Sequence, residues 1–261
     1  MQADFFAKKR RNSLAFLLAL AGVTLIAIVV TEYDVAKGFT SVPDAVAWAL
    51  GNFYPTQESL VKLPGIIDKL VETLLVSIAA TTVGAAAALL FAILGSNTTR
   101  VNAFFGSISR GIATVFRNID VAAWAMILLF SFGQSSLTGY FALFFGSFGF
   151  LTRSFVETID EASSGSVEAL RATGAGYFSI IFHSVIPSSM PQMISWVLFM
   201  IETNIRSATL IGLLTGSGIG FTFNLYYKSL NYDVAALVVL VIVAAILCIE
   251  AVSNYVRRVI L

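Results

Sequence analysis

Long hydrophobic stretches alternate with short polar segments along the whole chain. Each stretch is near or above the roughly 20 residues that an α-helix needs to cross a bilayer. The pattern predicts six membrane-spanning helices, at residues 12–31, 73–94, 101–132, 137–156, 190–215 and 234–252. The third stretch is too long for one span, so we expect Arg110 at the inner interface and Arg117 within snorkelling reach of it. We therefore predict an all-α integral membrane protein, a six-helix transmembrane bundle.

The charges between these stretches predict the orientation in the membrane. Residues 1–11 form a tail that contains four basic residues, whereas residues 32–72 hold six acidic residues against three lysines. Basic residues are retained on the cytoplasmic side of a membrane. We therefore expect cytoplasmic termini, a first transmembrane helix at 12–31, a periplasmic loop at 32–72 and a core transmembrane domain at 73–261.

The predicted outer loop contains three prolines. Pro43, Pro55 and Pro64 divide it into short pieces, and residues 44–50 are expected to form a small interfacial helix that carries Trp48.

Two repeating patterns indicate how the spans pack. Small residues recur at four-residue spacing in the second span, at Ala80, Gly84 and Ala88, which favours close contact between helices. In the fourth span five phenylalanines gather near one helical face, which predicts packing or lipid contact, or alternatively a gate: Phe141, Phe144, Phe145, Phe148 and Phe155.

Several charged residues lie inside the predicted spans, where a charge is costly and needs a partner, water or a function. Three pairs have the spacing of neighbours on one helix: Arg117 with Asp120, Arg153 with Glu157, and Glu202 with Arg206 around Asn204. One interpretation is that each pair holds a helix in register. The alternative places Arg117, Glu202, Asn204 and Arg206 along a path for an anion.

The composition excludes several classes of protein. The chain has 261 residues, of which 57% are hydrophobic, and a net charge of +1, so no concentrated basic surface for nucleic acid is expected. One histidine and one cysteine are too few for a His/Cys zinc site or a Cys-His nucleophile. No Gly-Lys-Ser/Thr sequence occurs, so this chain has no P-loop. We predict no catalytic residue and no metal site.

The longest polar interruption, residues 159–192, should lie outside the bilayer. Residues 167–173 combine helix-forming residues with one apolar side and one charged side, which predicts a short amphipathic helix. Gly174 and Gly176 should end it, because glycine adopts the left-handed conformation at helix ends. Pro187 and Pro191 suit the start of the next membrane helix rather than its interior.

This segment resembles the EAA loop of permease subunits in bacterial ABC importers. That pattern is Glu-Ala-Ala, three residues, Gly, nine residues and Ile-x-Leu-Pro. Glu168, Ala169, Gly174 and Pro187 match it, Ile186 replaces Leu, and Leu170 and Ser184 depart from it.

Taken together, four segments, two of them within this loop, resemble the permease of phosphonate-type importers. They are RNIDVAAW (117–124), VEALRATGA (167–175), VIPSSMPQ (185–192) and IETNIRSATLIGLLTGSGIG (201–220). Asp120 departs from the Pro that this family commonly has there.

The resemblance implies the fold of a type I ABC importer permease in the bacterial inner membrane. The implied partners are two ATPase subunits, which bind ATP and Mg²⁺, a periplasmic solute-binding protein and a second permease copy or paralogue. Glu168, Ala169, Leu170, Arg171 and Gly174 would couple the ATPases to transport. The implied substrate is phosphonate, phosphite or a related oxyanion.

Two other functions stay open at this point. One is a permease for another small solute, such as methionine or a polar amino acid. The other is an ATP-independent secondary transporter, which inverted repeats or unwound helices in mid-membrane would favour.

The orientation can be tested by cysteine labelling from outside intact cells, after Cys248 has been replaced by Ser. Since 32–72 is expected outside and 159–192 inside, an impermeant reagent should label Gln57→Cys and spare Ser164→Cys. The reverse pattern would invert the topology and remove the coupling assignment with it.

Overall fold

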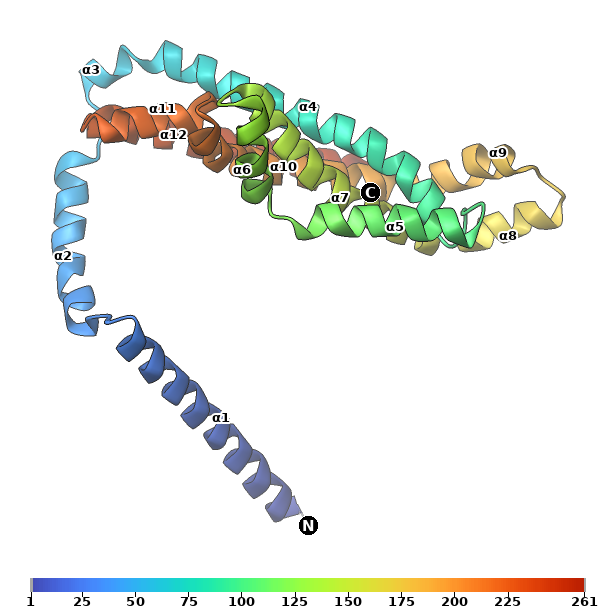
Figure 1. Cartoon of the computed structure of the whole chain (residues 1–261), viewed down its shortest axis with the longest axis horizontal. Helices are drawn as coiled ribbons and strands as arrows, with labels where there is room; N and C mark the ends of the chain where they lie inside the picture. The colour runs from blue at the N-terminus through green and yellow to red at the C-terminus, as the bar shows by residue number, and fades with distance from the viewer. Residues whose placement is uncertain (1, 261) are drawn as a thin grey trace. The chain divides into compact units, whose positions relative to one another are not determined.

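The structure is a computed structural model that describes residues 2–260, with the side chains of residues 8–163 and 165–259. The chain divides into two compact units, residues 1–54 and residues 55–261. The regular secondary structure of the described residues is helical throughout (Figure 1). The predicted all-α class is therefore confirmed.

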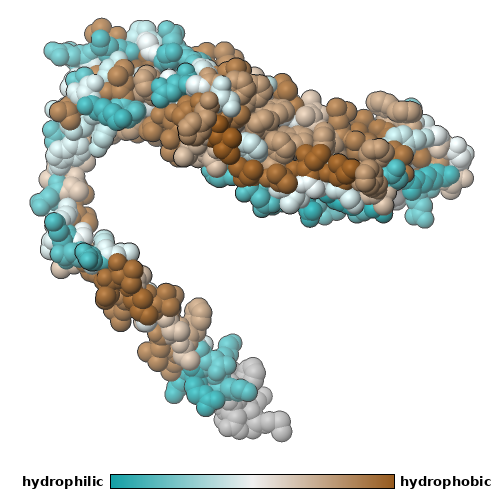
Figure 2. Space-filling view, viewed as in Figure 1, coloured by the Kyte–Doolittle hydropathy of each residue, from teal (hydrophilic) through white to brown (hydrophobic). Residues whose placement is uncertain are grey.

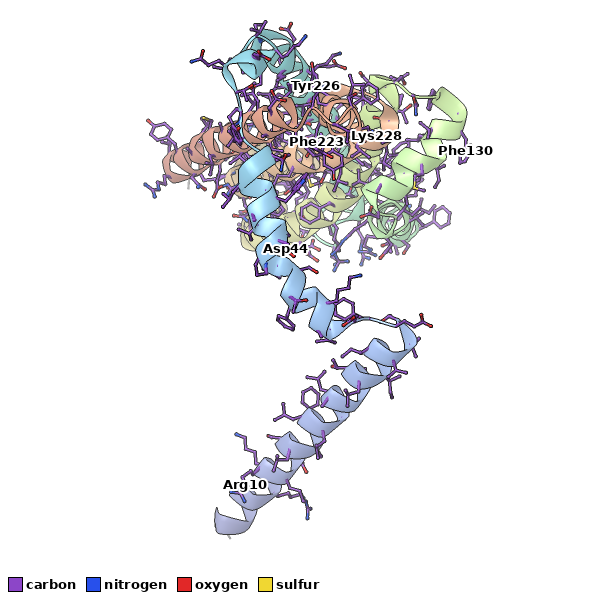
Figure 3. All side chains as sticks on the ribbon, turned by 90° about the vertical axis from the view of Figure 1, so that its left-hand side faces the viewer. Arg10, Asp44, Phe130, Phe223, Tyr226 and Lys228 are labelled. Atoms are coloured by element: carbon purple, nitrogen blue, oxygen red, sulfur yellow. The ribbon has the colours of Figure 1, made fainter. Side chains whose placement is uncertain are left out.

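The first unit consists of two helices. α1 (Gln2–Val30) contains the first predicted span, and its most apolar window buries none of its residues against protein. A surface of this kind is suited to lipid. α2 (Val35–Asn52) begins after Asp34, whose carboxylate accepts a hydrogen bond from the Lys37 N–H at 2.9 Å. Figure 3 labels Arg10 near the start of α1 and Asp44 on α2.

The short helix predicted at residues 44–50 is wrong in extent, because α2 runs straight through Pro43. Proline has a helical φ, and inside a helix it removes one backbone hydrogen bond. The flanking turns of α2 outweigh that loss. Pro55 and Pro64 do mark boundaries: Pro55 precedes α3 (Gln57–Leu60), and Pro64 lies in the first turn of the next helix.

The second unit is a helical bundle. Its long elements are α4 (Leu63–Gly95), α5 (Ala103–Asn118), α6 (Val121–Phe132), α7 (Ser136–Ala162), α10 (Ile186–Thr215), α11 (Gly218–Lys228) and α12 (Tyr232–Ile260). Between α7 and α10 lie α8 (Ser164–Ala172), α9 (Tyr177–Ile180) and the π-helical segment η1 (Ile181–Val185). Figure 1 shows α8 and α9 together at one end of this bundle. α4 begins within the predicted outer loop, so the end of that loop is helical.

The close contact of α4 with α7 organises the bundle. Ala80, Gly84 and Ala88 are all buried, as their spacing predicts. A Cβ added to Gly84 would lie 3.1 Å from the Ser147 Cβ and 3.4 Å from the backbone of α7. Small side chains therefore allow the two helices to approach more closely than larger ones would permit.

A buried polar network links this pair to α10. Asn204 is fully buried, and its Nδ2 donates to the Thr81 hydroxyl at 2.7 Å and to the Ser147 hydroxyl at 2.6 Å. Each hydroxyl in turn donates to a carbonyl of its own helix. The Asn204 Oδ1 is also buried and has no hydrogen-bond partner among the described residues. Hydrogen bonds of the kind that the Nδ2 makes between membrane helices stabilise helix association by about 0.6–2 kcal/mol in comparable cases.

The third hydrophobic stretch is broken rather than continuous. α5 and α6 meet at about 90°. Asp120 causes the new start, because its carboxylate accepts the Ala122 N–H at 2.8 Å as the cap of α6. The predicted pairing of Arg117 with Asp120 is therefore wrong. The apolar tip of α6 points away from the bundle at Phe130, which is 93% exposed (Figure 3).

Length and apolar composition identify four helices in the described chain that could cross a membrane, or five if α5 and α6 form one bent span. The fourth predicted span, α7, is not among them. α7 packs against α4, α5, α6 and α10, and it buries serines and threonines as well as apolar residues. Its neighbours rather than lipid cover much of its surface, so it tolerates a more polar sequence.

The phenylalanines of α7 pack against rings from other helices. Phe148 and Phe155 are buried. Phe116 lies 5.4 Å from Phe148 and 5.1 Å from Phe145, centroid to centroid, and Trp124 stacks on Phe116 at 5.2 Å. This arrangement supports the packing interpretation of the stripe.

Candidate functional site

The first candidate site is the knob formed by α8 and the turn that ends it. α8 covers residues 164–172, and Gly174 follows with a φ of +80°. The Ala175 N–H donates to the Leu170 carbonyl at 3.2 Å and closes the end of the helix. The predicted amphipathic helix and its stop at Gly174 are confirmed, whereas Gly176 has a φ of −69° and precedes α9.

Most of the polar segment 159–192 is helical. α7 continues to Ala162, and helical structure resumes at Tyr177 and runs to Thr215 through η1. Pro187 lies in the first turn of α10 as expected, but Pro191 lies inside the helix, contrary to prediction. The wide turn of η1, in which the Ile186 N–H bonds to the Ile181 carbonyl, joins α9 to α10 without a break.

α8 presents two different faces. Val167 is 1% exposed, and Leu170 packs against the same core cluster. Glu168, Ala169 and Arg171 are exposed. Two of the matched motif residues, Glu168 and Ala169, therefore lie on the exposed side of α8, while Leu170 holds α8 on the bundle.

Ser184, which departs from the EAA-loop pattern, has a structural role. Its hydroxyl donates to the Ser166 hydroxyl at 2.7 Å and joins η1 to α8. An isoleucine there could not make this bond.

Asp160 anchors the turn between α4 and α5 beside the knob. Its Oδ1 accepts from the Ser96 hydroxyl at 2.5 Å and from the Thr98 N–H and hydroxyl, each at 3.0 Å. Arg171 donates to the Thr98 carbonyl at 2.7 Å, so α8 holds the same turn. Sequence reasoning missed this connection, and the polar run SNTTR at 96–100 was the only local signal for it.

Two opposing effects act on the pKa of the Asp160 carboxyl. Burial raises it, and the hydrogen bonds from Ser96, Thr98 and Asn97 lower it by more, so the pKa lies below its ordinary value. Asp160 therefore stays ionised at neutral pH and stabilises the turn as a carboxylate.

The second candidate site is a charged group on α10. Glu202 is 12% exposed in its side chain and pairs with Arg206 at 3.0 Å, as its spacing predicts. It also pairs with Arg257 of α12 at 3.4 Å, which sequence spacing could not show. Arg206 is 47% exposed. Asn204 is not part of this group, because it lies buried against α4 and α7.

The other predicted residues lie elsewhere. Arg117 is exposed near the end of α5 and has no partner among the described residues. Arg153 pairs with Glu157 at 2.6 Å on the exposed side of α7, as predicted. In the described part of the chain no three His, Cys, Asp or Glu side chains lie together so as to hold a metal ion.

Comparison with known proteins identifies a family and a similar fold. Residues 80–260 match the family described as the binding-protein-dependent transport system inner membrane component. The methionine ABC transporter MetNI, in inward-facing conformations, has a similar fold, with a TM-score of 0.65 at 18% identity over 79% of this chain and 99% of that one.

Two curated relatives carry more specific names. The phosphate-import permease PhnE of Mycolicibacterium smegmatis is 28% identical over 186 residues, which cover 71% of this chain and only 35% of that protein. The phosphite transport system permease PtxC of Stutzerimonas stutzeri is 28% identical over 192 residues, which cover 74% of this chain and 70% of that protein.

Replacing Asp160 tests the anchor. A carboxyl whose pKa is lowered by folding stabilises the protein above its unfolded pKa of about 3.9, and this contribution disappears as the pH falls through the folded pKa. We expect Asp160→Asn to lower stability at neutral pH by about 1 kcal/mol, a value discounted for partial exposure.

The measurement is thermal unfolding of the purified protein between pH 3 and pH 7. The difference from wild type should shrink below about pH 4, and the exposed neighbour Glu161, changed to Gln, should have little effect. A difference that is the same at every pH would contradict the charged anchor.

Proposed function

Because the chain belongs to the family of binding-protein-dependent transport system inner membrane components, we propose that it is the permease of an ATP-driven importer for a phosphorus oxyanion. In this proposal two such chains, or this chain and a paralogue, form the path. Two ATPase subunits bind ATP and Mg²⁺, and a periplasmic protein delivers phosphonate, phosphite or phosphate.

The observation that carries the proposal is the geometry of the knob. α8 exposes Glu168 and Arg171 on a helix that apolar residues and a glycine turn hold at one end of the bundle (Figure 1). A rigid, exposed helix of this kind is suited to receive force from a partner. Through Arg171 and Asp160 the movement would reach the 96–99 turn, and through it α4 and α5.

The substrate class rests on the relatives and on charge. Two relatives are named for phosphate and phosphite. The likeness to the methionine transporter concerns the fold alone. An anionic substrate also agrees with arginines that lie inside predicted spans without full compensation.

We further propose an inner-membrane location with both termini in the cytoplasm. The four or five apolar helices support membrane insertion. The orientation follows from the basic tail and the acidic outer loop. In this orientation α8 faces the cytoplasm, where the ATPases would bind.

The coupling role predicts the behaviour of two substitutions. Gly174→Val forces a β-branched residue into the left-handed region, at a cost of about 1–2 kcal/mol, and should reorient the end of α8. Glu168→Lys reverses a charge on its exposed face. Both should reduce ATP hydrolysis stimulated by the loaded binding protein, while the complex still assembles.

The control is Gly165→Val, because Gly165 lies within α8 and, like Gly174, has free space around it, but its φ is not positive. Normal stimulated hydrolysis in both Gly174→Val and Glu168→Lys would exclude α8 as the coupling element.

The path is proposed to pass the charged group on α10. A half-exposed arginine inside a span needs water, a partner or an anion, and Glu202 shares its charge between Arg206 and Arg257. Arg206→Gln should therefore reduce oxyanion uptake per assembled complex several-fold. Glu202→Gln should mainly reduce assembly, since it removes the shared partner of both arginines.

Assembly and uptake are measured on the same preparations, with Arg258→Gln as an exposed control on α12. If Arg206→Gln and Glu202→Gln lose assembly equally and the remaining complex transports normally, the pair is structural only.

A further inference from the structure

A cleft between α5 and α7 gathers three arginines. It has a volume of about 330 Å³, and its polar lining consists of Arg110, Thr114, Arg117, Asn118, Thr152 and Arg153. None of its described lining residues is acidic. In Figure 2, hydrophilic side chains gather along the edge of the second unit where α5 lies. We refer to this feature as the arginine cleft.

The three guanidinium groups are compensated to different degrees. Arg110 donates to the Gly95 carbonyl at 3.0 Å and to the Asn97 side-chain oxygen at 3.1 Å, both of which are neutral. Arg153 is paired with Glu157. Arg117 has no partner in the described part of the chain. No carboxylate of the described residues therefore balances the positive charges of Arg110 and Arg117.

Close packing of α5 against α7 fixes the backbone on both sides of the cleft. A Cβ added to Gly149 of α7 would lie 2.5 Å from the backbone nitrogen of Arg117, so the end of α5 lies directly against α7. Ala113 is 3% exposed, and Thr152 is fully buried. The backbone positions from which Arg110, Arg117 and Arg153 extend are therefore set by this packing.

Uncompensated arginines within predicted spans are costly unless they meet water or an anion. A guanidinium group binds a tetrahedral oxyanion through two parallel charge-assisted hydrogen bonds. Several cations beside one cleft attract an anion more strongly than a single surface arginine does. A zwitterionic amino acid has no net charge and would gain much less from two uncompensated cations.

We propose that the arginine cleft binds the phosphorus oxyanion during transport, with Arg117 and Arg110 as its ligands and Arg153 at its rim. The inference rests on the proposed function, and it adds a binding site on α5 and α7 to the charged group on α10. The two places differ in character, because Arg206 has a carboxylate partner and Arg117 has none.

The first measurement tests whether the cleft is positively charged, and it does not depend on transport activity. The complete importer is prepared with Cys248→Ser, and a single cysteine is introduced by Asn118→Cys in the cleft or, as reference, by Ser131→Cys on exposed α6. Each is modified by an anionic and by a cationic thiosulfonate reagent. The ratio of anionic to cationic rate should be about tenfold higher at position 118.

Two substitutions of Arg117 distinguish an effect of its charge from an effect on folding. Arg117→Gln should bring the ratio at position 118 close to the reference value, and Arg117→Lys should restore most of it. Equal ratios at positions 118 and 131 in the parent protein would overturn the proposal. So would a ratio that Arg117→Gln leaves unchanged.

The second measurement identifies the ligand. Inorganic phosphate and phosphite should slow modification of Asn118→Cys in detergent, and methionine should not. Protection by sulfate alone would overturn the phosphorus assignment. Protection that appears only after anionic phospholipid is added, with none from free phosphate or phosphite, would assign the cleft to a lipid headgroup and overturn it as a transport site.

Uptake of phosphite, phosphate and a phosphonate by the Cys248→Ser parent separates this inference from the proposed function. Uptake driven by ATP, together with no protection by either phosphorus anion, overturns the cleft and leaves the proposed function standing. Protection by phosphate and phosphite without any uptake overturns the proposed function, while anion binding by the cleft stands.

Discussion

The close approach of α4 and α7 at Gly84 and Ser147 is the constraint on which the rest of the second unit depends. Without a side chain on Gly84, the two helices lie near enough for Asn204 to bridge Thr81 and Ser147. That bridge fixes α10 against both helices. In a membrane, where lipid competes equally for apolar surfaces, such small-residue contacts and buried hydrogen bonds supply much of the specificity.

This packing connects α8, the proposed ATPase-binding helix, with α5 and α7, which form the arginine cleft. The α4–α5 turn is held by Asp160 of α7 and by Arg171 of α8, so a displacement of α8 would reach the start of α5. The arginine cleft lies further along α5, where Gly149 brings that helix against α7. One set of contacts thus runs from the proposed ATPase surface to the proposed anion site.

Local features of the fold could be predicted from the sequence, and features that depend on distant neighbours could not. The glycine stop at Gly174, the small residues of α4 and the Glu202–Arg206 pair each follow from spacing within one helix. The contact of Arg257 with Glu202 joins residues far apart in sequence, which no local pattern reveals. Asp120 was expected to pair with Arg117 but caps α6, because the α5–α6 bend left backbone N–H groups to satisfy. Likewise, α2 continues through Pro43 because the turns on either side of it are helical, although proline itself disfavours a helix interior.

The central claim is that these contacts serve ATP-driven import of a phosphorus oxyanion. The most direct measurement is accumulation of radiolabelled phosphite inside proteoliposomes that contain the permease, its ATPases and the external binding protein. The account predicts accumulation against the concentration gradient with ATP, and none with a non-hydrolysable analogue. Accumulation that is independent of ATP, or ATP-driven accumulation of methionine but not of phosphite or phosphate, would contradict it.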